Sequence, residues 1–291
     1  FDAGTRTFSG TPPVNFNGTL LVRVTASDGS LAASDTFDLS IAAVNDAPVN
    51  TVPAAQTVNE DGTLVFSSAN GNAFSIADPD AGSGNVTVTL NATNGVLSLG
   101  STAGLAFTTG DGASDATMTF TGTLAAINTA LEGTTFSPGA NFNGSADVTI
   151  TTNDGGNTGT GGALQDADTV AITVTPVNDA PVVANAIADQ SGTEDTAFSY
   201  QVPGNAFSDV DGDALSYTAS LANGDPLPGW LSFDAGTRTF SGTPPVNFNG
   251  TLLVRVTASD GSLSASDTFD LSIAAVNDAP VNTVPAAQTV N

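Results

Sequence analysis

The sequence contains no cysteine, no histidine and no lysine, and its only cationic side chains are four arginines. Without cysteine, no disulfide can cross-link the chain. The absence of both cysteine and histidine excludes the usual sites for zinc, copper, haem and iron–sulfur clusters. The absence of lysine excludes a phosphate-binding P-loop. Hard cations that prefer oxygen ligands remain, calcium above all.

Positive charge and long apolar runs are also scarce. With 29 acidic residues the formal net charge is −25, so nucleic acids and anionic membranes are poor partners. No run approaches the roughly 18 apolar residues of a membrane helix, and we expect no membrane insertion. A 40% share of hydrophobic residues argues for folded cores rather than disorder. Nearly all the acids are aspartates, which suit turns, and they concentrate in loops.

The chain repeats itself. Residues 1–59 and 233–291 are identical except that Ala32 is replaced by Ser264. The string Val-Asn-Asp-Ala-Pro occurs at residues 44–48, 177–181 and 276–280, which we call the first, second and third linkers. The spacing between these strings alternates between long and short, so a long module and a short module alternate. Near-identical units in tandem are typical of arrays that stack in a line.

The linkers define the expected organisation. Residues 1–48 are predicted to be the second half of a short module, 49–180 a long module, 181–280 a complete short module, and 281–291 the first strand of another long module. Proline at the end of each linker stops strand pairing and stiffens the crossing. We therefore expect neither end to be a natural terminus.

Alternating apolar and polar residues predict mostly strands. One helix is expected over residues 123–131, where Leu124, Ile127 and Leu131 have helical spacing. Short strands separated by Gly, Asn and Pro predict an all-β chain of tandem antiparallel β-sandwich domains in an elongated array. The predicted strands cover residues 19–27, 35–41, 63–67, 86–92, 116–121, 147–152, 169–175, 251–259 and 267–273.

Three acidic signals recur in register with the modules: Asn-Asp in each linker, Asp-x-Asp early in each module, and an Asp near its end. Isolated pairs of this kind are mostly plain turns. Their recurrence in two modules of different length favours cation binding, and turn chemistry is the alternative. The residues are Asn45, Asp46, Asn178, Asp179, Asn277 and Asp278 in the linkers, Asp78, Asp80, Asp209 and Asp211 in the early pairs, and Asp28, Asp154 and Asp260 near the ends.

Longer motifs carry a family resemblance. In the short module they are residues 198–200, 209–217, 227–233, 240–245 and 256–261, and in the long module residues 59–62, 124–128, 141–144 and 151–154. On these motifs the chain resembles the cadherin family, and more closely the cadherin-like tandem domains of giant RTX-type bacterial surface adhesins. The short module resembles the dystroglycan-type cadherin-like domain. The resemblance covers essentially the whole chain.

The resemblance implies Ca²⁺ at each junction, held by an upstream glutamate, the linker Asn-Asp, and the downstream Asp-x-Asp and late Asp. The second linker has a full set; the others have partial sets. Pro176 and Ala43 replace a further aspartate of vertebrate cadherins, and only Glu132 weakly matches their second acidic motif, so one or two ions per junction are expected. The implied ligands are Glu60, Asn178, Asp179, Asp209, Asp211 and Asp260; Asn45, Asp46, Asp78, Asp80 and Asp154; and Glu194, Asn277 and Asp278.

Three further patterns are left outside the implied ligand sets. Residues 209–213 imitate the opening of an EF-hand loop, but Gly212 comes one position early and Ser220 replaces the closing Glu. The Gly-rich residues 155–162 predict a flexible hairpin loop. Trp230 could stack on a sugar, although its apolar neighbours favour a core position.

The function expected from the resemblance is structural. The chain would be a non-enzymatic repeat region of a large extracellular bacterial adhesin or fibre, secreted or on the cell surface, and stiffened by calcium between domains. Its partners would be neighbouring repeats, identical chains in a fibre, and cell-surface or polysaccharide ligands. The alternatives are a self-assembling filament or sheath subunit and a carbohydrate-binding module. A glycosidase would need only two carboxylates, but acids that recur at module boundaries argue against a single catalytic cleft.

Overall fold

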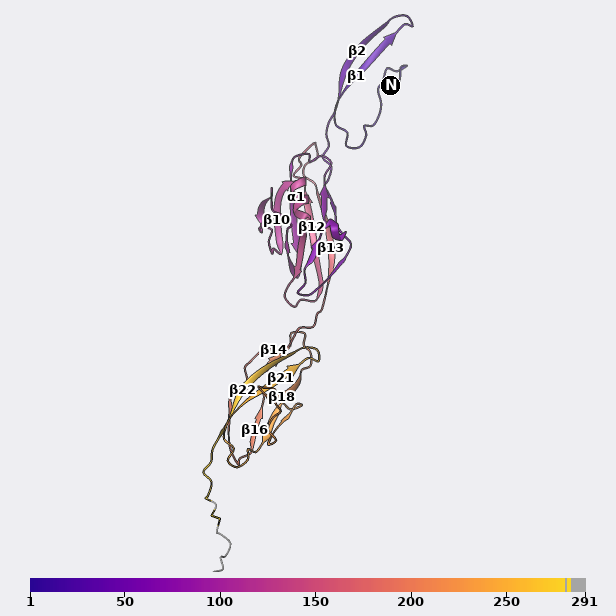
Figure 1. Cartoon of the computed structure of the whole chain (residues 1–291). Helices are drawn as coiled ribbons and strands as arrows, with labels where there is room; N and C mark the ends of the chain where they lie inside the picture. The colour runs from indigo at the N-terminus through magenta and orange to yellow at the C-terminus, as the bar shows by residue number, and fades with distance from the viewer. Residues whose placement is uncertain (281, 284–291) are drawn as a thin grey trace, which may run out of the picture. The chain divides into compact units, whose positions relative to one another are not determined.

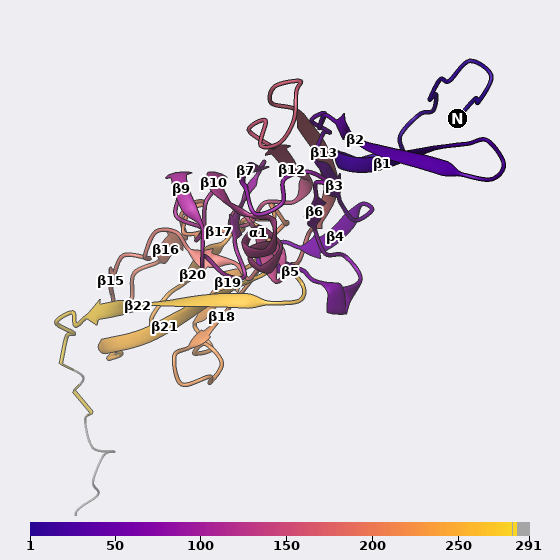
Figure 2. The same ribbon diagram turned by 90° about the horizontal axis from the view of Figure 1, so that it is seen from above.

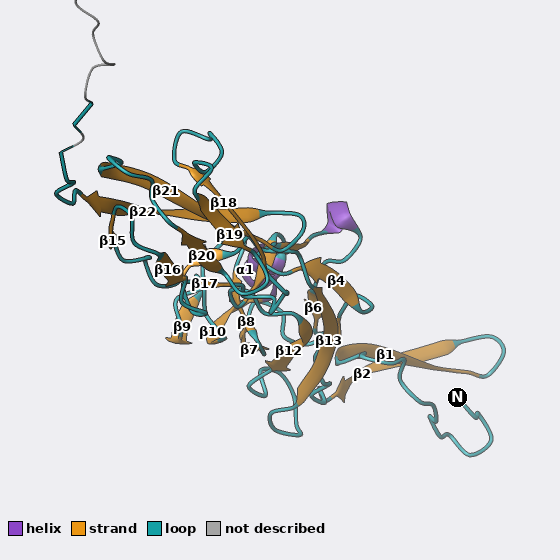
Figure 3. Ribbon diagram, turned by 90° about the horizontal axis from the view of Figure 1, so that it is seen from below, coloured by secondary structure: helices purple, strands orange, loops and turns teal. Residues whose placement is uncertain are grey.

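The computed structural model describes residues 1–280, 282 and 283 (Figure 1). The chain divides into two compact units, Phe1–Val177 and Asn178–Asn291. Strands and loops make up nearly all of it, together with one α-helix and one short 3-10 helix among the described residues (Figure 3). Neither helix has the length and apolar character needed to span a lipid bilayer. The strand predicted over residues 281–291 falls almost entirely outside the described residues.

The long module is built from two main sheets. The larger sheet has six strands in the order β4-β13-β12-β7-β10-β9, the smaller has three in the order β5-β11-β8, and β3 pairs separately with β6. The strands are β3 (Val49–Thr51), β4 (Gln56–Asn59), β5 (Leu64–Phe66), β6 (Ser75–Ala77), β7 (Asn85–Ala92), β8 (Gly95–Ser98), β9 (Ala106–Thr109), β10 (Thr117–Thr123), β11 (Thr134–Pro138), β12 (Gly144–Asn153) and β13 (Gln165–Thr175).

Period-two alternation places one face of these strands in the core. In β7 the side chains of Val86, Val88 and Leu90 are buried, and the threonines between them are half-buried. The helix α1 (Leu124–Leu131) begins where the Thr123 side chain accepts a hydrogen bond from the Ala126 amide, an ordinary N-cap. The predicted helix is therefore confirmed, and each predicted strand overlaps an observed one.

The short module also has two main sheets. The four-stranded sheet has the order β15-β22-β21-β18, the three-stranded sheet has the order β16-β20-β19, and β14 pairs with β17. Figure 2 shows the long strands β21 and β22 side by side. The strands are β14 (Val182–Val183), β15 (Gln190–Thr193), β16 (Phe198–Gln201), β17 (Phe207–Ser208), β18 (Ser216–Leu221), β19 (Leu231–Asp234), β20 (Thr239–Gly242), β21 (Gly250–Ser259) and β22 (Ser264–Ala274).

One strand pair in each module departs from the expected antiparallel pattern. β4 lies parallel to β13, and β15 lies parallel to β22. In a parallel pair the two strands end at the same edge of the sheet. Glu60 follows β4 directly, and its amide continues the ladder by donating to the Thr175 carbonyl at the end of β13, at 2.9 Å. Each module thereby brings a glutamate to the place where its last strand runs into the next linker.

The N-terminal copy of the repeat forms a hairpin of β1 (Gly18–Ser27) and β2 (Ala32–Ile41). Its register matches that of β21 and β22 residue for residue. The aromatic stacking matches as well, since Phe8 lies 5.5 Å from Phe37 and its copy Phe240 lies 5.6 Å from Phe269 between ring centroids. Burial differs, because Phe240 is 0% exposed and Phe8 is 45% exposed. The same ring is thus buried in the short-module core and exposed in the N-terminal copy of the repeat.

This pair of copies offers a matched test of the short-module core. Phe240→Ala removes a fully buried ring and is expected to lower the free energy of unfolding of the short module by about 3–5 kcal/mol. Phe8→Ala removes the same ring from an exposed setting and is expected to leave that transition unchanged. Urea unfolding followed by circular dichroism measures both variants. Equal effects of the two substitutions would contradict the assignment of Phe240 to the core.

Candidate metal centre

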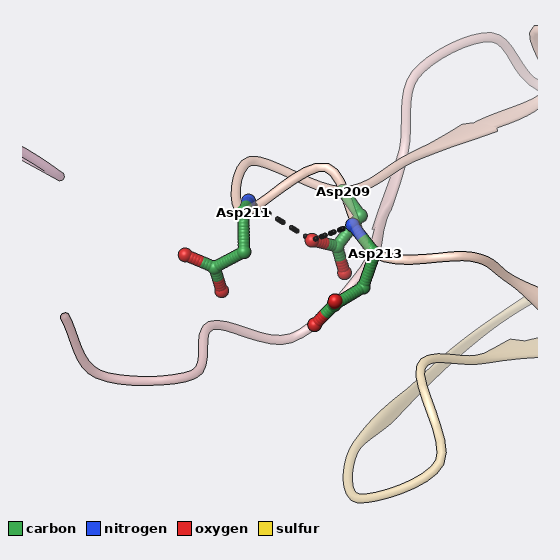
Figure 4. Close-up of side chains that lie close together, drawn as sticks. All are labelled: Asp209, Asp211 and Asp213. Atoms are coloured by element: carbon green, nitrogen blue, oxygen red, sulfur yellow. Dashed lines mark hydrogen bonds between the residues drawn. The ribbon is translucent and has the colours of Figure 1, made fainter.

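Each module contains a tight turn built by the first aspartate of its Asp-x-Asp pair. In the long module this turn follows β6, and Asp78 Oδ1 accepts hydrogen bonds from the amides of Asp80 and Ala81, both at 3.0 Å. In the short module it follows β17, and Asp209 Oδ1 accepts from the amides of Asp211 at 3.0 Å and Asp213 at 3.5 Å (Figure 4). In both turns the first aspartate uses one oxygen to shape the backbone.

The other oxygen of the same carboxylate finds no donor. Asp78 Oδ2 and Asp209 Oδ2 are buried and have no hydrogen-bond partner. An ionised carboxylate can only accept, so a buried oxygen of this kind loses its hydration without replacement. A buried carboxylate oxygen without a hydrogen-bond donor therefore occurs at equivalent positions of two modules that differ in length and sequence.

The second aspartate of each pair accepts a hydrogen bond from the linker backbone. The Asp46 amide donates to Asp80 Oδ2 at 2.8 Å in the long module. The Asp179 amide donates to Asp211 Oδ2 at 2.7 Å in the short module. Each Asp-x-Asp turn therefore sits against the linker that precedes its own module.

The late aspartate of each module accepts a hydrogen bond from the side chain of the linker asparagine. Asn45 Nδ2 donates to Asp154 Oδ2 at 2.6 Å, and Asn178 Nδ2 donates to Asp260 Oδ2 at 2.9 Å. Both amide side chains use their NH₂ group on the aspartate, and Asn45 Oδ1 is buried with no hydrogen-bond partner. The structure thus brings together all five residues predicted at the first linker, and all those predicted on the short module at the second.

A third aspartate joins the cluster of the short module. One oxygen each of Asp209, Asp211 and Asp213 can lie within 4.8 Å of the others, an arrangement able to hold a metal ion (Figure 4). Asp213 was absent from the implied ligand set because the cadherin pattern includes only the first two aspartates of this turn. The Asp-x-Asp-x-Asp spacing could have identified Asp213. A tight turn brings alternate side chains together whether or not the rest of an EF-hand loop follows.

The two upstream glutamates share one geometry. Glu60 Oε1 accepts a hydrogen bond from the Val177 amide, and Glu194 Oε1 accepts from the Val276 amide, both at 2.6 Å. Each glutamate is 2% exposed. The second oxygens differ, because Glu60 Oε2 accepts from Asn143 Nδ2 at 3.4 Å and Glu194 Oε2 has no hydrogen-bond partner.

Burial and hydrogen bonding shift the pKa values of three aspartates at the linkers. Burial, and next its side-chain interaction with Asp80, raise the pKa of Asp78 above its ordinary value. Burial would also raise the pKa of Asp154, but hydrogen bonds led by that from the Leu164 amide bring it below its ordinary value. The Leu263 amide, followed by the Asn178 side chain, lowers the pKa of Asp260. A nearby cation would favour the charged form of all three.

The donor set fits a hard cation. Three buried oxygens of these residues, Asn45 Oδ1, Asp78 Oδ2 and Asp209 Oδ2, have no hydrogen-bond donor, and every side chain that could contribute is a carboxylate or an amide. Calcium takes six to eight oxygen ligands in flexible geometry, and these residues supply only oxygen. The residues that could hold it are Asn45, Asp46, Asp78, Asp80 and Asp154 on the long module, and Asn178, Asp179, Asp209, Asp211, Asp213 and Asp260 on the short module.

Other candidates from the sequence lie outside the two Asp-x-Asp turns. Asn277 and Asp278 are exposed and lie outside regular secondary structure. Glu132 accepts hydrogen bonds from the amide and hydroxyl of Ser68 at the start of the 3-10 helix. Trp230 packs against the core with its ring 5.4 Å from that of Phe248, which confirms the predicted core position.

Comparisons with known proteins agree with an Ig-type sandwich. Residues 180–274, less than half of the chain, match the family described as "Putative Ig domain". No curated protein matches the sequence. With the all-β architecture, this match supports an Ig-like sandwich fold for the short module.

Several solved structures resemble this chain in part, at low sequence identity to it. Mouse clustered PcdhgC3 EC1-3 is 14% identical with a TM-score of 0.39, covering 90% of this chain and 77% of that one. Human mucin-like protocadherin EC1-2 is 18% identical with a TM-score of 0.37, covering 78% of this chain and 99% of that one. An endo-fucoidan hydrolase of glycoside hydrolase family 107 is 19% identical with a TM-score of 0.30, covering 92% of this chain. The chain spans 35% of the length of that hydrolase.

The glutamate geometry predicts an anchoring role that does not require metal. Glu60→Ala removes the acceptor of the Val177 amide and is expected to lower the free energy of unfolding of the long module by about 1.5–3 kcal/mol in EDTA, because the lost bond is to a charged group. Glu60→Gln keeps an acceptor oxygen and should lose less. Urea unfolding in EDTA measures both, and equal losses for the two variants would argue against the hydrogen bond as the cause.

Proposed function

We propose that the Asp-x-Asp turn of each module, together with the linker that precedes it, binds calcium. The observation that carries this proposal is the recurrence of a buried carboxylate oxygen without a donor, Asp78 Oδ2 in one module and Asp209 Oδ2 in the other. Chance burial of an unsatisfied anion costs free energy and is selected against. Its presence at equivalent positions of two dissimilar modules is best explained by a cation that both positions are built to receive.

Electrostatics supports the same proposal. Asp209, Asp211 and Asp213 crowd three carboxylates within reach of one another, and the chain has no lysine and only four arginines to offset them. Like charges this close repel one another and oppose folding unless a counter-charge is present. A divalent ion supplies that charge, and its binding free energy then becomes part of the folding free energy of the module.

The position of these ligands suggests what binding achieves. Each set includes the Asn-Asp pair of a linker, so an ion on the turn would fix the linker against the module that follows it. A chain of Ig-like modules with restrained linkers would act as a spacer. We propose that the protein is a non-enzymatic structural or adhesion-type segment, outside the cell, where calcium sites with dissociation constants of roughly 10⁻⁴–10⁻³ M are occupied.

Isosteric substitutions test calcium binding. Asp209→Asn keeps the Oδ1 acceptor of the turn and removes the charge from Oδ2, and Asp78→Asn does the same in the long module. We expect calorimetric titration of the chain with Ca²⁺ to show that each variant weakens binding at one class of site by at least about tenfold. The control Asp225→Asn changes an exposed aspartate whose side chain bonds to Asn223 in a loop, and it should bind like the unmodified chain.

Thermal unfolding provides the matching readout. Calcium at about 100 times its dissociation constant should stabilise the unmodified chain by about 2.7 kcal/mol per site. No heat of binding and no rise in Tm with calcium would defeat the proposal.

Small-angle scattering tests the stiffening role. In calcium the unmodified chain should show a narrower distribution of intramolecular distances than in EDTA, because bound ions remove bending freedom at the linkers. The double variant Asp78→Asn with Asp209→Asn should give the EDTA profile in both buffers. Superimposable profiles of the unmodified chain in calcium and EDTA would show that the ions, even if bound, do not stiffen it.

A further inference from the structure

The Gly-rich loop, residues 155–163, is an insertion that leaves the surrounding hairpin unchanged. It lies between Asp154 and Leu164, where the short module has only a tight turn between Asp260 and Leu263. In both modules the aspartate amide donates to the leucine carbonyl, at 3.1 and 3.3 Å. The leucine amide donates back to the aspartate Oδ1, at 2.8 and 2.7 Å. The late aspartate therefore does not need the longer loop for its own geometry.

The loop instead pairs with the first linker, within the same compact unit. Thr160 forms a parallel bridge with Val44. The Asn45 amide donates to the Thr160 carbonyl at 3.0 Å, and the Thr160 amide donates to the Ala43 carbonyl at 3.1 Å. Asn45 Nδ2 also donates to the Gly162 carbonyl at 2.9 Å. These three hydrogen bonds add to the two that the aspartates of the long module make with the linker.

The fit between loop and linker is close enough to require glycine. Gly159 has φ +102, and a Cβ added there would lie 2.7 Å from both Asn45 N and Val44 C. Real Cβ atoms do not approach backbone so closely, so any side chain at this position would push the loop away from the linker. Gly155, by contrast, has φ +68 and open space around its Cβ position.

The second linker is seated differently. Asn178, the counterpart of Asn45, is exposed and is held by its side chain on Asp260 at 2.9 Å. Asn45 is only 6% exposed. The turn between Asp260 and Leu263 is too short to reach a linker and pair with its backbone. The same five-residue linker sequence is thus held by different contacts in the two modules.

We propose that the Gly-rich loop is a latch that keeps the first linker seated on the long module in the absence of any cation, whereas the second linker depends on the cation for its seating. The second half of this statement rests on the calcium function proposed above. Along the chain, joints of two kinds would then alternate. One kind would stay ordered when calcium is withdrawn, and the other would loosen.

Amide hydrogen exchange on the full chain in EDTA tests the latch, because exchange reports local opening. In one variant, residues 155–163 are replaced by Gly-Ser, which reproduces the short-module turn between Asp154 and Leu164. In another, Gly159→Ala introduces the clashing Cβ. We expect the Asn45 amide to exchange at least about tenfold faster in both variants than in the unmodified chain, from the loss of its hydrogen bonds. Gly155→Ala, a left-handed glycine in open space, is the matched control and should keep the slow rate.

Unchanged protection of amides in β12 and β13 confirms that the variants fold. If Asn45 exchanges as fast in the unmodified chain as in the Gly-Ser variant, the latch is wrong, whatever calcium does. Adding Ca²⁺ to the unmodified chain should slow exchange at Asn178 and leave the already slow Asn45 little changed. Slow exchange at Asn45 in EDTA with no calcium effect at Asn178 would support the latch and overturn the cation-dependent half of the proposal.

Discussion

The first aspartate of each Asp-x-Asp turn has two carboxylate oxygens with different roles, and the module boundary depends on that division. One oxygen binds backbone amides and fixes the turn, which in turn places the second aspartate where it accepts the linker amide. The other oxygen is buried without a donor. The buried turn holds the linker by a hydrogen bond to the linker amide. It also leaves a buried negative oxygen that a cation could stabilise. Turn, linker and cation are therefore parts of one local arrangement.

At the other end of each module, the parallel strand pair also places an acidic side chain against the linker. Because β4 ends beside the end of β13, Glu60 reaches the Val177 amide, and β15 with β22 brings Glu194 to Val276 in the same way. Each glutamate is buried where the chain leaves the module. If β4 and β15 ran antiparallel to their partners, the glutamate would lie at the opposite edge of the sheet. The topology of the sandwich, rather than the linker sequence, thus decides which acidic group meets the departing chain.

Local patterns were sufficient for most of the fold. Alternation located the strands, and the spacing of Leu124, Ile127 and Leu131 located the helix, because both depend on neighbours in sequence. The parallel pairing of β4 depends on contacts across the whole module, and no short pattern reports it. The candidate site shows the same limit. Repetition in register identified most aspartates, while Asp213 was missed because the long module has no third aspartate at this spacing and the cadherin pattern includes only two. Nothing in the glycine-rich composition of residues 155–163 indicates the backbone pairing with Val44.

The identity of the linkers places the control of stiffness in the modules. All three linkers have the sequence Val-Asn-Asp-Ala-Pro, so a difference in how firmly they are held cannot come from the linkers themselves. It must come from the surface that receives them. The hairpin that contains Asp154 or Asp260 is one part of that surface that varies. Its closing Asp and Leu make the same hydrogen bonds in both modules whatever lies between them. A loop inserted at this point can therefore change one joint without altering the turn, the acidic ligands or the fold of the sandwich.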